Sequence, residues 1–353
     1  METKNQGLKN EMRSKRVLIF LLVLLSINFC CTTDISLAAE QLTYRLKWLF
    51  NTSAVGGLYA NAHGFFADEG LEVTIKAGGP EKDAIKELEL GYADFGVASA
   101  DQVIRALAKG ASVVVIAQLF QENPLQWIYR LDHLKLDGLG DLKGRVIGIT
   151  YGGNDETIMR TILAKGGIKE DEVELFSVRY DYTPFYKRQV DLWPVYRNTQ
   201  AVLISDKLKD AGETVAFFRP ADYGVRFVAN SVVTSEKMFW QHPQTVGKFI
   251  RALFKGWNQA LDPVNRQEAI AILRRFGDDT SADVLVKQLE ITRAFMMPAA
   301  DIPLGGIDVE AWKQTEQVML GQKVIHRPVF VEKHLKSVHL SKGIYEPEKT
   351  GKN

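Results

Sequence analysis

The sequence predicts an α/β fold of two lobes with a binding cleft between them. Strands alternate with helices of about ten to fifteen residues, which is typical of a mainly parallel sheet. The alternation restarts after the glycine-rich segment 138–144, and the chain turns helical from about residue 243 to near its end. A second set of strands followed by a helical return indicates two α/β units rather than one.

The first 39 residues differ in composition from the rest. Basic residues at positions 4, 9, 13, 15 and 16 precede the uncharged run VLIFLLVLLSI (17–27), and Ser36-Leu37-Ala38-Ala39 closes the segment. This order is typical of a secretory signal peptide, and the run is shorter than the roughly 20 residues that a membrane span needs. We expect cleavage after Ala38 or Ala39 and a mature protein in the periplasm or elsewhere outside the cytoplasm.

Both cysteines, Cys30 and Cys31, lie in this segment. Lipid attachment to either is disfavoured, because bulky Phe29 precedes Cys30. The mature chain would hold no thiol, which excludes disulfides, cysteine nucleophiles and thiolate metal sites. The full chain has 44 basic and 43 acidic residues, so a role in nucleic-acid binding has no electrostatic support.

The hydrophobic patterns predict the individual elements. Residues 42–50 alternate between an apolar face that includes Trp48 and a polar face that includes Lys47, as a strand does. The helices 55–69 and 100–110 end at or next to glycines, a common helix terminator. Further strands are expected at 71–77, 93–99, 112–120, 145–150, 172–178, 189–195, 201–204, 214–219 and 226–235, and further helices at 82–91, from the loop at 151–157 to about 165, 243–261, 265–275, 280–296 and 308–322.

Ligands of open α/β sheets bind at the carboxyl ends of strands, which directs attention to residues 48–51, 98–101, 120–122, 150–155 and 193–198. Trp48 can stack on a heterocycle or pack in the core, and Asn51 can bind its edge. Gly152 and Gly153 permit close backbone approach before a helix start. The alternative for that loop is an ordinary helix entry capped by Asn154 or Asp155.

A second aromatic cluster, Trp193 to Asn198, suits a cleft wall, with core packing of Trp193 as the alternative. The six histidines show no metal-ligand spacing, so we expect no metal site. The sequence contains no Gly-x-Ser-x-Gly nucleophile elbow. We therefore predict no catalytic residue and no cofactor.

The chain resembles the type 2 periplasmic binding proteins of the thiamine-pyrimidine-synthase-like family, which includes aliphatic sulfonate, taurine and pyrimidine-precursor binders of ABC importers. The segments that carry the resemblance are GLYANAHGFFADEGLEV (57–73), ELGYADFGVASADQVIRALAKG (89–110), DLKGRVIGI (141–149) and VVTSEKMFWQHPQTVGKFIRAL (232–253). The resemblance implies a monomer that closes over a small solute and docks on an ABC permease in the membrane. Lobe 1 would combine 40–140 with 235–340, lobe 2 would span 141–234, and 341–353 would be a flexible tail.

The resemblance also suggests roles for the site residues. Trp48 and Trp193 would stack on the solute and Tyr196 would line the cleft, while Asn51, Ser99, Asn154 and Asn198 would bind the solute's edge and Gly152 and Gly153 would offer N–H groups. Phe50-Asn51-Thr52-Ser53-Ala54 keeps the Asn and Thr, but not the Pro and His, of the motif typical of pyrimidine-precursor binders.

The alternative function is that of the thiamine pyrimidine synthase on the same scaffold, which consumes pyridoxal phosphate and histidine. Its cofactor lysine and the histidine four residues later correspond to Ala98 and Gln102 here, and its cysteine-rich motif falls on residues 224–228, which contain no cysteine. A Schiff base needs an amine. The sequence therefore favours a solute carrier.

Overall fold

The computed structural model describes residues 38–79, 81–179, 181–277, 280–299 and 302–337. The first strand begins at Glu40, and the chain from there on forms one compact unit. The predicted tail and all but the last two residues of the predicted signal peptide lie outside the described residues. Within those residues, no helix is both long and apolar enough to cross a membrane.

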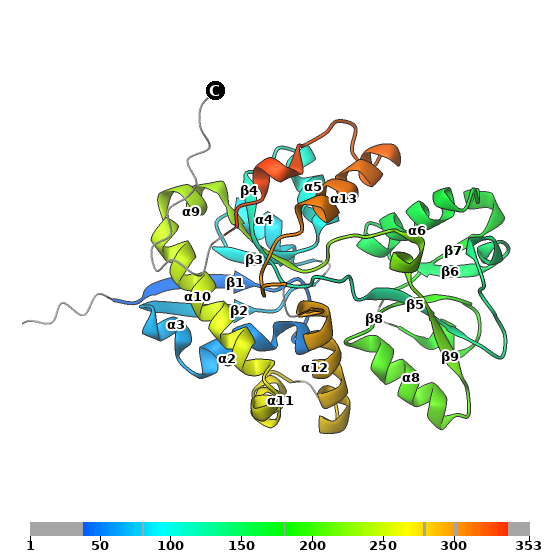
Figure 1. Cartoon of the computed structure of the whole chain (residues 1–353), viewed down its shortest axis with the longest axis horizontal. Helices are drawn as coiled ribbons and strands as arrows, with labels where there is room; N and C mark the ends of the chain where they lie inside the picture. Colours follow the sequence, from blue (N-terminus) through cyan, green and yellow to red (C-terminus); the bar gives the residue numbers. More distant parts are fainter. Residues whose placement is uncertain (1–37, 80, 180, 278–279, 300–301, 338–353) are drawn as a thin grey trace, which may run out of the picture. The chain divides into compact units, whose positions relative to one another are not determined.

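The first sheet has five strands in the order β2-β1-β3-β10-β4 (Figure 1). Strand β1 pairs in parallel with both β2 and β3, whereas β10 runs antiparallel between β3 and β4. The bounds are Glu40–Arg45 for β1, Leu71–Lys76 for β2, Phe95–Ala98 for β3, Val113–Gln118 for β4 and Ser231–Ser235 for β10. Strand β10 therefore joins this sheet from more than 100 residues further along the chain than β4.

The second set of strands repeats this arrangement. Strand β5 (Leu125–Arg130) pairs antiparallel with β8 (Trp193–Tyr196) and β9 (Val215–Phe218), and β6 (Val146–Ile149) pairs in parallel with β7 (Glu174–Ser177). A parallel bridge between Ile147 and Leu192 links β6 to the segment before β8. The order β7-β6-β8-β5-β9 thus matches that of the first sheet, with β5 in the place of β10, although the sequence shows no internal repeat.

The helices confirm most of the sequence prediction. They are α2 (Val55–Ala62), α3 (Phe65–Asp68), α4 (Ala84–Glu89), α5 (Ala100–Ala108), α6 (Asn154–Lys165), α7 (Thr183–Tyr186), α8 (Gln200–Asp210), α9 (Glu236–Gln241), α10 (Pro243–Ala260), α11 (Arg266–Arg274), α12 (Ala282–Met296) and α13 (Val309–Gly321). Short 3-10 turns occur at Thr52–Ala54, Leu139–Leu142, Glu170–Glu172, Pro220–Tyr223, Pro263–Asn265 and Val331–His334.

Several details differ from the prediction, and helices α7 and α9 were not predicted. The strand expected at 201–204 is the start of helix α8, since Ala201, Ile204 and Leu208 are buried at helical spacing. The helix expected at 55–69 is broken at Gly64, which has a φ of 69°. Strand β1 ends at Arg45, so residues 46–50 do not continue it. Strand β5 was not predicted at all.

Helices α2 and α10 pack closely beside the first sheet (Figure 1). A Cβ added at Gly56 would lie 2.1 Å from Cδ2 of Trp257, and one added at Gly256 would lie 2.3 Å from the carbonyl oxygen of Gly56. The indole of Trp257 is 1% exposed. Glycine at these two positions therefore allows the backbones of the helices to approach each other.

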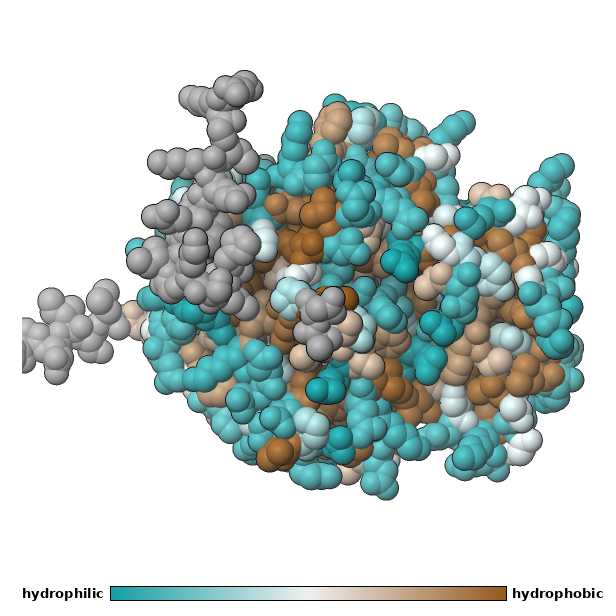
Figure 2. Space-filling model, viewed as in Figure 1, coloured by the Kyte–Doolittle hydropathy of each residue, from teal (hydrophilic) through white to brown (hydrophobic). Residues whose placement is uncertain are grey.

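Hydrophilic side chains cover most of the face shown in Figure 2.

Strand β5 lies inside the range 40–140 that the sequence assigns to lobe 1, but its partners β8 and β9 lie in the range 141–234. The lobe boundaries themselves stay a prediction. We propose from this pairing that the chain crosses to the second lobe before Leu125 rather than after Gly140.

Candidate functional site

Side chains from both sets of strands meet at the phenol of Tyr196, the last residue of β8. Its oxygen accepts hydrogen bonds from Lys47 Nζ at 3.0 Å and from Asn154 Nδ2 at 3.2 Å. Lys47 follows strand β1 by two residues, and Asn154 begins helix α6 after strand β6. Three segments that follow or end strands therefore converge at this point, as the rule for open α/β sheets predicts.

Lys47 is half-buried at this junction. Burial opposes its charged form, but Tyr196, Asp101 and Asp155 favour it by more, so the pKa of Lys47 lies above its ordinary value. The ammonium therefore stays charged at neutral pH. It makes no ion pair within the described part of the chain, although carboxylates on helices α5 and α6 lie near enough to act on it.

The two nearby carboxylates are each bound to their own helix start. Asp101 accepts a hydrogen bond from Ser99 Oγ at 2.6 Å and forms an ion pair with Arg105 at 3.4 Å. Asp155 accepts from the Thr150 N–H at 2.6 Å. Burial raises the pKa of Asp155 to about 6. Both residues lie in the first turn of a helix, where the N-terminal dipole stabilises a negative charge.

Arg105 on helix α5 connects the first sheet's helix layer to the glycine loop before α6. Its guanidinium donates to the carbonyl oxygen of Gly152 at 2.7 Å, to that of Gly153 at 3.5 Å and to Thr157 Oγ1 at 2.6 Å. Gly152 has a φ of 79°. The loop thus presents its carbonyl oxygens to Arg105.

Gly153 requires glycine for a steric reason. A Cβ there would lie 2.4 Å from Asp155 Oδ1 and 2.8 Å from the carbonyl oxygen of Thr150. Gly153 is also the N-cap of α6, so neither of the N-caps considered from sequence, Asn154 and Asp155, holds that position. The reason is that the helix begins one residue earlier, with Asn154 already in its first turn.

Asn198, whose side chain is buried, forms a second connection. Its Nδ2 donates to Ser53 Oγ at 2.9 Å and to Thr292 Oγ1 at 3.1 Å, and its backbone carbonyl accepts from Thr52 Oγ1 at 3.2 Å. Helix α12 therefore contributes Thr292 to the junction. Because Asn198 is 0% exposed, this arrangement fixes the segment after β8 against the turn after β1.

The remaining predicted residues lie near these connections. Trp48 is half-buried beyond the end of β1, and its carbonyl oxygen accepts from the Gly78 N–H. The Asn51 side chain accepts from the Ser53 N–H at 2.8 Å and caps the following turn. Ser99 is fully buried, and its hydroxyl bonds Asp101 and Gln102. Contact of these side chains with a solute stays a prediction.

Trp193 lies apart from this group. It is 1% exposed and packs in a hydrophobic cluster with Ile128, Phe185 and Val195. The rings of Phe185 and Trp193 are 6.1 Å apart. The sequence left open two positions for Trp193, a cleft wall and the core. In the structure Trp193 packs in the core.

Sequence reasoning missed Lys47, Arg105 and Thr292, and it assigned no role to Asp101 although it directed attention to residues 98–101. Alternation in the first strand did place Lys47 on a polar face, which was the available signal. Arg105 and Thr292 lie within helices whose sequence contains nothing to distinguish them from solvated residues. Only the packing of α5 and α12 brings them to the junction.

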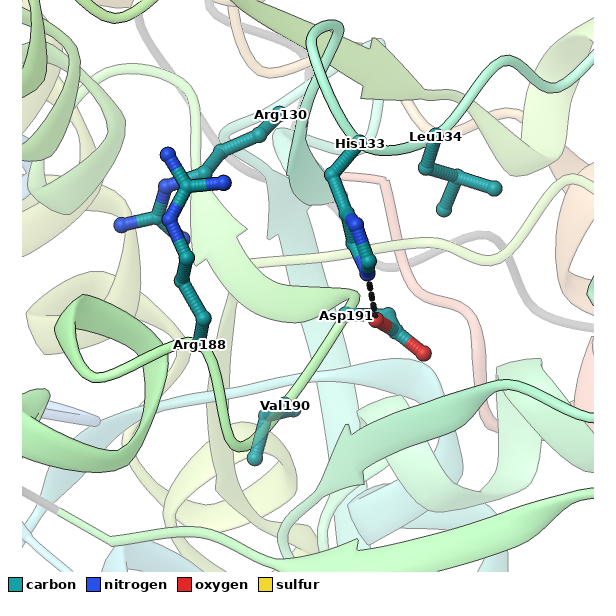
Figure 3. A pocket seen from close by; sticks show the side chains of 6 residues that line it. All are labelled: Arg130, His133, Leu134, Arg188, Val190 and Asp191. Atoms are coloured by element: carbon teal, nitrogen blue, oxygen red, sulfur yellow. Dashed lines mark ion pairs between the residues drawn. The ribbon is translucent and has the colours of Figure 1, made fainter.

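A small cavity of about 10 Å³ lies elsewhere, between the end of β5 and the segment before β8. Arg130, His133, Arg188 and Asp191 line it, and His133 pairs with Asp191 at 3.2 Å (Figure 3). This volume admits about one water molecule, so the cavity cannot hold a heteroaromatic solute. Among the residues that the structure describes, no group of three His, Cys, Asp or Glu side chains is placed to hold a metal ion.

The positions of the synthase's cofactor residues have structural roles here. Ala98 is 2% exposed within β3. The Gln102 side chain accepts from the Ser99 N–H at 3.1 Å and completes the cap of helix α5. Neither residue offers an amine.

Comparison with known proteins yields several relatives. The chain is 24% identical over 335 residues to the formylaminopyrimidine-binding protein of Halalkalibacterium halodurans, which covers 93% of this chain and 99% of that protein. It is 25% identical to the riboflavin-binding protein RibY of Chloroflexus aurantiacus, covering 87% and 88%. A 4-amino-5-hydroxymethyl-2-methylpyrimidine phosphate synthase of Legionella pneumophila is 25% identical over a smaller share, 62% and 68%.

The fold matches solved structures. The periplasmic aliphatic sulphonate binding protein SsuA of Escherichia coli superimposes with a TM-score of 0.67 at 16% identity, covering 89% of this chain and 97% of that one. The chain therefore has the two-lobed α/β fold of a periplasmic binding protein, as predicted, and its relatives support a solute-binding role. The NMT1/THI5 like family matches residues 51–266, more than half of the chain, and the chain belongs to that family.

Proposed function

We propose that this protein is an extracytoplasmic solute-binding protein that delivers a small heteroaromatic solute to an ABC permease and performs no chemistry of its own. Two relatives that cover most of the chain bind heteroaromatic solutes, by name a formylaminopyrimidine and riboflavin. The synthase of Legionella pneumophila covers less of the chain. The proposal therefore follows the relatives with the greater coverage.

The observation that carries the proposal is the junction at Tyr196. Lys47 and Asn154, which follow strands of different sheets, both donate to its phenol oxygen. A solute held at this point would contact both lobes at once, so its binding would favour their closed arrangement. The half-buried indole of Trp48, one residue beyond Lys47, offers the aromatic face on which a heterocycle would stack.

The proposal includes the predicted processing and partner. The mature protein would begin after Ala38 or Ala39, act as a monomer outside the cytoplasm and dock on its permease in the closed form. The two lobes would be joined by the crossings that lead into β5 and β10.

Mass spectrometry of the solute that copurifies with the protein tests this function. The chain should be expressed with its own N-terminal segment and recovered from the exported fraction. A thermal-shift screen of pyrimidines, flavins and sulfonates would follow. A solute at a hundredfold excess over its dissociation constant stabilises the folded state by about 2.7 kcal/mol, which such a screen detects.

Paired variants locate the site. We expect Trp48→Ala and Asn154→Ala to weaken binding of the solute at least tenfold, and Trp240→Ala, which removes a half-exposed indole on α9, to leave it unchanged. Failure of every solute class to shift unfolding would overturn the proposal. Visible absorbance from bound pyridoxal phosphate, with formation of the pyrimidine product, would assign the synthase function instead.

A further inference from the structure

The charge of Lys47 indicates which class of solute the junction accepts. Its ammonium is half-buried, donates to Tyr196 at 3.0 Å and has no ion-pair partner among the described residues. Removing a charge from water without a paired charge is costly. A hydrogen bond to the Tyr196 phenol satisfies one of its three N–H groups, and the carboxylates that favour its charge act on it without direct contact.

The neighbouring carboxylates do not supply the missing partner. Asp101 forms its ion pair with Arg105 and receives the Ser99 hydroxyl, while Asp155 receives the Thr150 N–H. These carboxylates lie at the starts of α5 and α6, where the helix dipoles offset their charge. Lys47 thus faces two helix starts whose acidic residues are already bound.

Two donors also converge on one oxygen atom. Lys47 Nζ and Asn154 Nδ2 lie 3.0 and 3.2 Å from the phenol oxygen of Tyr196. In the described part of the chain, the phenol hydrogen finds no acceptor. Two donors directed at one point are suited to hold an oxyanion of a solute there.

We propose that the solute carries an acidic group, a carboxylate or another oxyanion, that binds the Lys47 ammonium beside Asn154 and the Tyr196 hydroxyl. The phenol hydrogen of Tyr196 would then donate to the same group. This inference rests on the proposed function, because it names the chemical class of the solute at that site. The inference adds that the solute is negatively charged, which the names of the pyrimidine- and flavin-binding relatives do not state.

Matched pairs of acids and neutral analogues test the inference on the exported protein. The probes are nicotinate with nicotinamide, pyrimidine-5-carboxylate with its carboxamide, and riboflavin 5′-phosphate with riboflavin. We expect the acidic member of at least one pair to stabilise the protein and its neutral partner to bind at least tenfold more weakly. The solute that copurifies should carry an acidic group when identified by mass spectrometry.

Substitution of Lys47 gives an independent measurement. Lys47→Met should weaken binding of the acidic probe at least tenfold, Lys47→Arg should retain more of it, and Lys109→Met, which removes an exposed ammonium at the end of α5, should have no effect. Equal binding of acid and amide, or an unchanged affinity in Lys47→Met, would overturn the inference and leave the proposed function intact. Binding of no solute at all would overturn both. The comparison of acid and amide needs no variant, so a poorly folding Lys47→Met would still leave a decisive result.

Discussion

The guanidinium of Arg105 donates to Thr157 Oγ1 at 2.6 Å, although 52 residues separate them. The same group donates to the carbonyl oxygens of Gly152 and Gly153. Helix α5 is thereby tied to helix α6 and to the loop that precedes it. Arg105 is a positioning residue for the Asn154 side chain, which begins α6 beside Tyr196.

We expect Arg105→Met to release this loop. Loss of hydrogen bonds from a charged donor costs about 1 to 3 kcal/mol, so amide hydrogen exchange at residues 151–157 should accelerate. Arg226→Met, which removes an exposed guanidinium, is the control and should leave exchange there unchanged. Unaltered protection of residues 151–157 in Arg105→Met would contradict the connecting role.

Removal of the Tyr196 hydroxyl should destabilise the protein. In Tyr196→Phe the Lys47 ammonium and the Asn154 amide both lose their acceptor, and unmade hydrogen bonds of this kind cost about 1 to 3 kcal/mol. Urea denaturation measures the free energy of unfolding. Tyr151→Phe serves as the control, because that tyrosine is 54% exposed, and should change stability by less than about 0.5 kcal/mol. Equal effects of the two substitutions would show that the junction adds no stability.

The carboxyl of Asp155 should make stability depend on pH. Burial raises its pKa to about 6 in the folded protein, whereas an aspartate in an unfolded chain titrates near 3.9. The folded state therefore binds this proton more tightly, and the contribution of Asp155 to stability falls as pH rises from about 4 to about 6. The loss is on the order of 2 to 3 kcal/mol.

Asp155→Asn should remove that loss. The amide oxygen can still accept from the Thr150 N–H but does not ionise, so the melting temperature of the variant relative to the parent should be higher at pH 7 than at pH 4. Asp210→Asn, at an exposed position at the end of α8, should show the parent's pH profile. A parent-like profile for Asp155→Asn would rule out the titration.

The contact of α2 with α10 should tolerate no side chain at Gly56. A methyl group there would overlap the Trp257 indole, 2.1 Å from Cδ2, and overpacking of this severity costs about 3 kcal/mol. Gly140→Ala is the control, because a Cβ at Gly140 meets no atom within 4 Å. Chemical denaturation of both variants measures the difference. A Gly56→Ala protein as stable as the control would mean that the two helices can separate at little cost.

The sequence predicted most of the fold because hydrophobic periodicity is a local property. Helices α10 and α13 and strands β2 and β4 lie within a few residues of their predicted bounds. Strand β5 was missed because Gln126 and Arg130 interrupt its apolar residues, so the segment shows neither alternation nor the continuous apolar run of β4, although all six residues are buried. The run Val202-Leu203-Ile204 was assigned to a strand because three branched residues favour one, but their burial follows the surface of α8.

The candidate site was predictable only where strand ends mark it. Tyr196 and Asn198 end or follow strand β8 and meet residues that follow β1, and Asn154 donates to the same Tyr196 phenol. Lys47 and Arg105 were not predicted, because their partners are 149 and about 50 residues away and no local pattern records such distances. Trp193 was predicted as a site residue but lies in the core. The sequence could not decide between these positions, because the same aromatic residue on a strand suits either one.

The central positions of β10 and β5 among their partner strands have a consequence for how the chain folds. Strand β10 separates β3 from β4, so the first sheet is divided until residues 231–235 have been made and placed. Strand β5 also lies between its partners β8 and β9, but it precedes both of them in the sequence. The strands β5 to β9 occupy one continuous stretch of the chain, whereas the strands of the first sheet lie on both sides of that stretch. A chain emerging N-terminus first can therefore complete the second set of strands before β10 is made, whereas the first sheet must wait for β10, so the first sheet should be the last to be completed.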